Sequence, residues 1–179
     1  MILTGAEIAR QHERGRITID PFTPDQVNPN SYNFQLGPTI KTYTGQVLDV
    51  ARPNPARDLT IGEQGLVLEP DRIYLGHTLE VMGSDHYVPI IRARSSIARL
   101  GLFVHVTADL IDIGSHNQWT LQLHAVQPVR VYAGLLIGQV TFWRVQGDIV
   151  LYDGKYQGAR GPRESEIYRD FPAGAGVGA

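Results

Sequence analysis

The sequence Q-W-T-L-Q-L-H at residues 118–124 alternates apolar with polar side chains. This two-residue period is typical of a β-strand with one buried face, because successive side chains of a strand point to opposite sides of the sheet. The predicted polar face carries Thr120, Gln122 and His124. A solvated sheet surface gives the same pattern, so these side chains form a functional site only if other chemically active motifs lie beside them.

Short segments rich in Val, Ile, Tyr and Thr recur along the chain and are separated by Gly and Pro. They include Y-V-P-I-I-R-A-R at 87–94, L-F-V-H-V-T at 102–107, P-V-R-V-Y-A-G at 128–134 and I-G-Q-V-T-F-W at 137–143. Short strands with frequent turn signals favour an all-β sandwich or barrel over alternating βαβ units. Near the N-terminus, Thr4 and Glu7 have the spacing of a capping box, and Gly15 is a stop signal. We therefore expect a mainly β fold with a short N-terminal helix.

The composition limits both the domain count and the partners. A chain of 179 residues with 42% apolar content can form one domain with a proper core. We expect this domain at residues 1–171, followed by a flexible Gly/Ala-rich tail at 172–179. A formal charge of -2 gives no overall attraction to a nucleic acid polymer or an anionic membrane. Without cysteine or a membrane-length apolar run, the sequence favours a cytoplasmic protein.

A cationic motif, R-A-R-S-S-I-A-R at 92–99, ends one of the predicted strands. Guanidinium groups, serine hydroxyls and free backbone N–H groups at a strand-to-helix turn are the donors that phosphate oxygens need. A solvated turn with surface ion pairs would contain the same residues. The motif alone leaves these two interpretations open.

Two further motifs have a similar ambiguity. T-A-D-L-I-D-I-G at 107–114 places an aspartate just before a glycine, where a carboxylate can accept from a sugar hydroxyl or orient a water molecule. Turn aspartates more often bond to their own backbone. G-K-Y-Q-G-A-R-G-P at 154–162 is rich in glycine and cationic. It is either a lid over a phosphate or a basic linker.

The order and spacing of these motifs resemble the dCTP deaminases, which are related to the trimeric dUTPases. The resemblance also includes M-I-L-T-G-A-E-I at 1–8, N-P-N-S-Y-N-F-Q-L-G at 28–37 and T-L-Q-L at 120–123, and it covers about residues 1–171. It implies a distorted β-barrel or jelly-roll protomer, assembled as a homotrimer with nucleotide sites between subunits. The implied ligand is a deoxypyrimidine nucleoside triphosphate (dCTP, dUTP or dTTP), with Mg²⁺ carried by the triphosphate and no metal ligand from the protein.

The resemblance also implies roles for individual residues. The triphosphate and the reacting centre would be lined by Arg94, Ser95, Ser96 and Arg99, with Ser95 and Arg99 acting in catalysis. Asp112 would meet the deoxyribose 3′-hydroxyl. The remaining implied nucleotide contacts are Ala108, Thr120, Leu121, Gln122, Gln139, Tyr152 and Lys155, with the strand residues 120–122 at the base and Lys155 on phosphate.

One departure from the family concerns the chemistry itself. Without cysteine the chain cannot build the His/Cys/Cys zinc site of other cytosine deaminases. Attack of water on C4 of cytosine then needs a protein group that takes a proton and later delivers one, as a carboxylate does. The family has a glutamate at the position of Gln122, and a carboxamide does not ionise. General acid–base catalysis is typically worth about 10² to 10⁴ in rate, so we expect impaired deamination of dCTP to dUTP and ammonia.

Other departures leave several functions open. S-H-N-Q at 115–118 replaces the usual glycine-bearing turn, and Ala159 stands where a phosphate-binding glutamine is often found. Gln122 is therefore either an engineered trap or the mark of a natural branch in which His116 or His124 moves protons. Alternatively, the protein is a dUTPase-like pyrophosphatase that uses Asp112 to activate water, or a non-catalytic nucleotide-binding regulator.

Overall fold

The computed structural model describes residues 1–105 and 107–171. The predicted tail at 172–179 lies outside the described residues. The strands are β1 (Thr18–Asp20), β2 (Tyr32–Gln35), β3 (Thr39–Tyr43), β4 (Ala56–Thr60), β5 (Leu66–Leu68), β6 (Tyr74–His77), β7 (Val81–Gly83), β8 (Tyr87–Ala93), β9 (Leu102–Phe103), β10 (Thr120–Ala125), β11 (Val129–Val131) and β12 (Leu136–Arg144). The helices are α1 (Gly5–Glu13) and α2 (Ser95–Ala98), with 3₁₀ turns η1 (Pro24–Gln26) and η2 (Ile167–Asp170). The prediction of a mainly β fold with a short N-terminal helix is confirmed.

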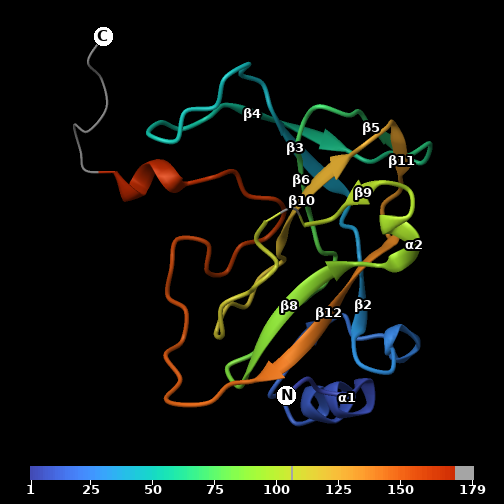
Figure 1. Cartoon of the computed structure of the whole chain (residues 1–179), viewed down its shortest axis with the longest axis vertical. Coiled ribbons are helices and arrows are strands. Elements are labelled where there is room, and N and C mark those ends of the chain that lie inside the picture. Colours follow the sequence, from blue (N-terminus) through green and yellow to red (C-terminus); the bar gives the residue numbers. More distant parts are fainter. Residues whose placement is uncertain (106, 172–179) are drawn as a thin grey trace.

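The strands form small antiparallel sheets rather than one continuous sheet (Figure 1). The largest has the order β4-β3-β6-β10-β9, and a second has the order β2-β12-β8. Two strand pairs, β1-β7 and β11-β5, complete the fold. Several sheet neighbours, such as β6 with β10 and β2 with β12, are far apart in sequence, so this arrangement brings distant segments of the chain side by side.

Helix α1 follows the capping pattern read from the sequence. The Thr4 hydroxyl accepts a hydrogen bond from the Glu7 N–H at 3.3 Å, which satisfies one of the free donors at the helix start. Ile8 is fully buried on the inner face of the helix. The helix lies at the end of the molecule opposite the β4–β5 region, beneath β8 and β12 (Figure 1).

The core lies between the sheets and is built from alternating strand residues. Phe34, Ile91 and Phe142 from the three-stranded sheet have no exposed surface, and neither do Leu121 and Leu123 from β10. The polar residues of β10 are only partly buried, so burial alternates along the strand as the sequence at 118–124 predicts. Each fully buried side chain of this size contributes about 1.5–3 kcal/mol by leaving water.

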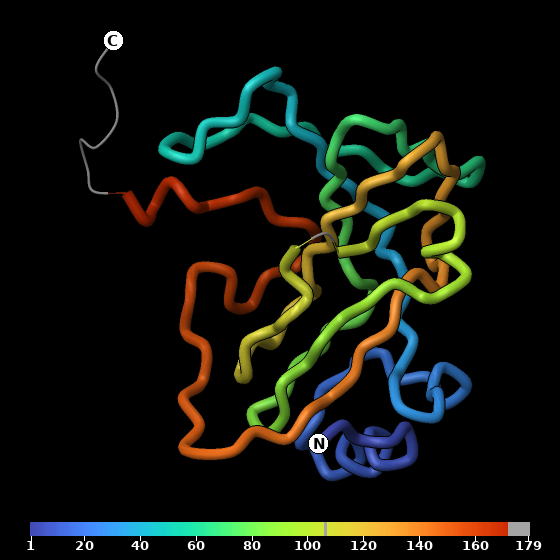
Figure 2. Tube along the Cα trace, viewed as in Figure 1, coloured from blue at the N-terminus to red at the C-terminus, as the bar shows by residue number. Residues whose placement is uncertain are grey.

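The chain after β12 makes a long excursion. It leaves the lower end of β12, passes along the side of the molecule and returns towards β10 before it ends at η2 (Figure 2). We call residues 152–171 the C-terminal strap. Among the described helices, none combines the length and apolar character needed to cross a membrane.

Candidate functional site

A cavity of about 500 Å³ opens on the polar face of β10. It is bordered by the five-stranded sheet, the segment before β10 and the C-terminal strap. Its described lining includes Tyr43, Leu48, Ile73, Leu75, His105, Ala108, Ile111, Asp112, Thr120, Gln122, Tyr152, Tyr156, Arg163 and Glu164. Apolar walls with a few converging polar groups, at this volume, are typical of small-molecule sites.

Gln122 is placed in this cavity by the alternation of β10. Leu121 and Leu123 bury their side chains on the opposite face, so the amide of Gln122 lies on the cavity side. Its Nε2 donates to the Thr120 carbonyl at 3.4 Å, whereas its Oε1 is buried and has no hydrogen-bond partner among the described residues. A buried acceptor without a donor is costly, and a ligand N–H or a water molecule would satisfy it.

The turn that carries Asp112 is fixed by Gly114, the last residue of the motif at 107–114. Gly114 has a φ of 90°, and a Cβ at this position would lie 2.8 Å from the Cβ of Leu151. Its N–H donates to the Ser84 carbonyl at 2.8 Å, and the Tyr152 N–H donates to the Ile113 carbonyl at 2.8 Å. These contacts hold Asp112 and Tyr152 together at one wall of the cavity, because the turn packs directly on the start of the strap.

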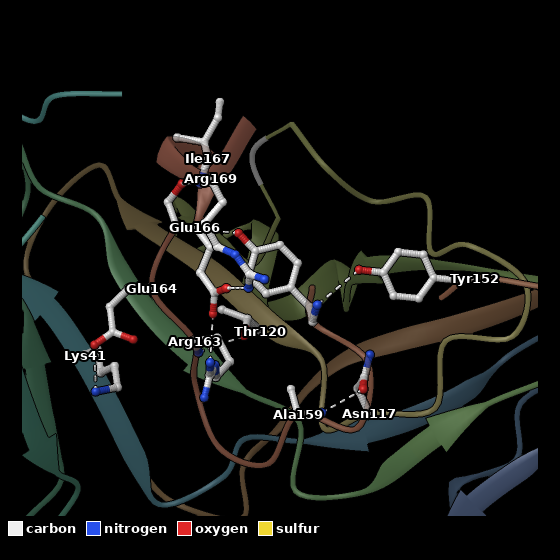
Figure 3. A network of polar contacts seen from close by, with 12 residues as sticks. Lys41, Asn117, Thr120, Tyr152, Ala159, Arg163, Glu164, Glu166, Ile167 and Arg169 are labelled. Carbon is white, nitrogen blue, oxygen red and sulfur yellow. Dashed lines mark hydrogen bonds and ion pairs between the residues drawn. The ribbon is translucent and has the colours of Figure 1, made fainter. Parts of the chain in front are cut away.

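The unusual S-H-N-Q turn has a structural explanation in the strap. The Asn117 side chain accepts from the Ala159 N–H at 2.9 Å (Figure 3). The Gln118 side chain accepts from the Gly161 N–H at 2.7 Å. The Arg163 N–H then donates to the Thr120 hydroxyl at 3.0 Å. Residues of the strap therefore form one wall of the cavity, held there by these hydrogen bonds to the turn and to β10.

The structure brings together five of the residues predicted to bind nucleotide. They line the cavity from three separate segments: Ala108, Asp112, Thr120, Gln122 and Tyr152. Leu121 differs from this group, since its side chain is fully buried in the core and only its backbone borders the polar face. Ala159, at the position of the family's glutamine, also lines the cavity.

The other predicted residues lie outside the described lining of this cavity. Arg94, the N-cap of α2, donates to the Leu136 carbonyl at 3.4 Å, and Ser95, Ser96 and Arg99 are exposed at α2. Helix α2 lies beyond β9, away from the strap (Figure 1). On β12, the Gln139 side chain accepts from the Ser31 hydroxyl at 3.0 Å. Lys155 forms an ion pair with Asp170 at 2.6 Å. Within the single chain, the predicted phosphate donors at α2 therefore do not meet the predicted base-binding residues.

The two histidines considered from the sequence also lie outside the described lining. His116 Nε2 lies 2.8 Å from Asp85 Oδ1, and His124 Nδ1 lies 3.3 Å from the Arg72 carbonyl oxygen. The histidine that does line the cavity is His105. Its Nδ1 lies 3.1 Å from the Val104 carbonyl oxygen, and burial lowers the pKa of its ring.

Sequence reasoning missed the charged groups that the strap brings to the cavity. Glu164 forms an ion pair with Lys41 at 3.0 Å, and Lys41 also contacts Asp58 at 2.8 Å (Figure 3 draws the first pair). The available signal was an acidic residue just after a glycine-rich segment already suspected to be a lid. Nothing local in the sequence places that residue opposite β3, because the contact depends on the path of the strap.

Comparison with known proteins now gives the family. Residues 2–145 match the family model described as dCTP deaminase-like. The chain belongs to this family. A protein of Clostridium acetobutylicum named "dCTP deaminase, dUMP-forming" is 45% identical over 172 residues, covering 96% of this chain and 99% of the relative. A protein of the same name from Leptospira biflexa serovar Patoc is 44% identical over 172 residues, with coverages of 96% and 98%.

A solved structure supports the same fold. The crystal structure of the 2′-deoxycytidine 5′-triphosphate deaminase from Agrobacterium tumefaciens aligns with a TM-score of 0.63 at 20% identity. The match covers 79% of this chain and 47% of that chain, so the protein spans about half the length of this structural neighbour. The family and the fold class expected from the sequence are thus confirmed.

Proposed function

We propose that the protein binds a deoxypyrimidine nucleoside triphosphate in the β10 cavity and hydrolyses the C4 amino group of dCTP. The observation that carries this proposal is the meeting of Asp112, Thr120, Gln122 and Tyr152 around one cavity in a dCTP deaminase-like chain. The apolar walls suit a flat pyrimidine ring, and the buried Gln122 Oε1 is an acceptor for an amino group or a water molecule. The Asp112 carboxylate is suited to accept from a sugar hydroxyl.

The triphosphate is bound, in this proposal, by α2 of a neighbouring copy in a homotrimer. Two observations support this arrangement. Ser95, Ser96 and Arg99 lie exposed at α2 outside their own protomer's described cavity lining. Near them, Leu100, Phe103 and Val126 expose 53%, 50% and 65% of their surface, an apolar area that a subunit interface would cover. Mg²⁺ would accompany the triphosphate, held by phosphate oxygens and water.

The proposed final products are dUMP, ammonia and pyrophosphate. The sequence led us to expect dUTP, but the relatives at 45% and 44% identity are named as dUMP-forming. One water replaces the C4 amino group, and a second water attacks the α-phosphorus as pyrophosphate leaves. Asp112 is the cavity carboxylate we assign to orient this second water, in line with the pyrophosphatase alternative raised by its hairpin.

A paired assay of ammonia and pyrophosphate, with dCTP and dUTP as separate substrates, tests the proposal. We expect both products from dCTP and pyrophosphate alone from dUTP. Because the amide of Gln122 does not ionise, ammonia release should be slower than in an otherwise identical protein with glutamate there. Pyrophosphate from dUTP without ammonia from dCTP would instead identify a pyrophosphatase. Tight binding without either product would identify a regulatory binder.

A further inference from the structure

We propose that Glu164 of the C-terminal strap supplies the carboxylate that position 122 lacks. The inference rests on the proposed deamination of a cytosine nucleotide in the β10 cavity. Both Glu164 and Gln122 line this cavity, although Glu164 belongs to the strap, outside the sheets, and Gln122 belongs to β10.

The strand register places Gln122 in line with the partner of Glu164. Gln122 on β10 pairs with Leu75 on β6, and Leu75 pairs with Lys41 on β3. Directly paired residues point to the same face of a sheet, so Lys41 and Gln122 share one face at about 10 Å, two strand spacings. Lys41 contacts Glu164 at 3.0 Å from this face. The carboxylate is therefore held above the same row of residues.

The strap is anchored on both sides of Glu164. On one side, the Arg163 N–H donates to the Thr120 hydroxyl of β10 at 3.0 Å. On the other side, the Ser165 N–H donates to the Tyr43 hydroxyl of β3 at 2.9 Å. Because its two neighbours are bonded to side chains of β10 and β3, which flank β6, Glu164 is held at the cavity between these two anchors. Figure 3 shows Glu164 with its carboxylate turned towards Lys41, beside Arg163 and Thr120.

The positive charge of Lys41 keeps the Glu164 carboxyl group ionised. Burial alone would raise the pKa of Glu164, but its hydrogen bond and ion pair with Lys41, together with its own backbone N–H and Arg163, outweigh burial and lower it. The carboxylates of Asp58 and Glu164 in turn raise the pKa of the Lys41 ammonium. At neutral pH the cavity thus contains an ionised carboxylate, and its lowered pKa makes it a weaker base towards water but, once protonated, a stronger acid towards the ring and the leaving amine.

The proton transfers balance with one carboxylate. As the water oxygen bonds to C4, Glu164 takes one proton from that water and delivers it to N3 of the ring. Glu164 then takes the second proton from the C4 hydroxyl of the tetrahedral intermediate and gives it to N4. The C4–N4 bond breaks, ammonia leaves, a C4 carbonyl forms, and the carboxylate is regenerated. Gln122 holds the water or the amino group through its amide, as its shape permits.

His105 is the competing proton carrier in the cavity. Its ring is held by the Val104 carbonyl oxygen, and no hydrogen bond connects it to β10 among the described residues. The strap, by contrast, bonds directly to Thr120, the next side chain on the face of Gln122. This connection favours Glu164, and the variant His105→Asn distinguishes the two.

The experiment compares ammonia release from dCTP in the unmutated protein with that in three single variants, Glu164→Gln, Gln122→Glu and His105→Asn. It also includes the double variant that combines Glu164→Gln with Gln122→Glu. Calorimetric titration of each with dCTP gives the affinity separately. We expect Glu164→Gln to lower kcat about 100-fold or more with an affinity within about threefold of the starting protein. The double variant should recover ammonia release, because the carboxylate is moved across the cavity. Asp58→Asn is the matched control, since it removes the other carboxylate on Lys41, and it should leave kcat unchanged.

Several outcomes would overturn the role of Glu164. An unchanged kcat in Glu164→Gln would overturn it. A double variant no faster than Glu164→Gln alone would also overturn it, because this result would indicate that Glu164 only fastens the strap. If His105→Asn loses ammonia release while Glu164→Gln keeps it, the proton transfers belong to the histidine. A starting protein that binds dCTP without releasing ammonia, while Gln122→Glu releases it, would reject Glu164 but keep the nucleotide site. Failure of every variant to bind dCTP would reject the proposed function itself.

Discussion

The cavity on β10 and the exposed helix α2 both carry residues expected to bind one nucleotide, yet their surroundings differ. In the cavity, Asp112 and Gln122 are held by a glycine turn and by strand register, and residues of the strap line the same cavity. At α2, Ser95 and Arg99 are exposed, and the helix is only four residues long. The residues expected at the base and sugar thus lie around one cavity of the chain, whereas the residues expected at the phosphates lie exposed outside its described lining. This difference leads to the interfacial site proposed above.

The largest expected effect is a complementation between these two regions. Arg99→Ala and Asp112→Asn should each abolish turnover of dCTP, one by removing a phosphate donor and the other by removing a cavity carboxylate. If each site combines α2 of one copy with the cavity of the next, mixed trimers contain some sites in which both contributions are intact. Random mixing at equal amounts makes about a quarter of the sites intact in a cyclic trimer.

The measurement is pyrophosphate release after the two inactive variants are denatured together, refolded and compared with separately refolded controls. Recovery towards a quarter of the unmutated activity supports a shared site. An inactive mixture that still forms trimers by light scattering would place both regions in the same protomer, and a monomer at micromolar concentration would remove the basis of the comparison.

The second prediction concerns the cavity alone. Gln122→Glu should raise ammonia release from dCTP about 10²-fold, because a carboxylate on β10 would lie next to the ring without depending on the strap. The affinity for dCTP should change little, since the two side chains have almost the same shape. Steady-state ammonia assays and calorimetry measure the two quantities separately. Equal rates before and after the substitution would show that position 122 takes no part in proton transfer.

The third prediction separates the two faces of β10. Leu121→Ala should reduce the free energy of unfolding by about 2–5 kcal/mol, because Leu121 is fully buried and its removal leaves a cavity in the core. His124→Ala, on the partly exposed face, should reduce the free energy of unfolding by less than about 1 kcal/mol. Urea unfolding at one fixed protein concentration gives both values, and similar losses at the two positions would contradict the assignment of the faces.

The smallest expected effect is a shift in the pH dependence of ammonia release. Lys41 helps to hold the pKa of Glu164 below its usual range, against burial, which acts to raise it. Activity that needs the ionised carboxylate is present above this pKa and is lost as the pH falls through it. Lys41→Gln should raise the pKa and therefore move the acid limb of kcat to higher pH. An acid limb that stays in place would mean that another group titrates.

The local pattern of the sequence was enough to predict several features because they depend on neighbouring residues. The period of two at 118–124 gave β10 and its two faces, and the capping spacing at Thr4 gave α1. The order of the motifs led to the family, now confirmed over residues 2–145. Asp112 and Gln122 were recognised as candidates since their motifs carry the relevant chemistry in a few consecutive residues.

Only the tertiary structure decided which of these groups meet. Glu164 reaches Lys41 because the strap crosses from β10 to β3, and Lys41 lines up with Gln122 because β3 and β10 flank β6. These contacts depend on sheet order and on the path of a long connection, neither of which leaves a periodic signal in the sequence. The same reason explains why the residues of α2, although their motif is easily read, lie outside the described lining of the cavity. A sequence specifies the chemistry of a donor locally, but its partner is set by the packing of distant segments.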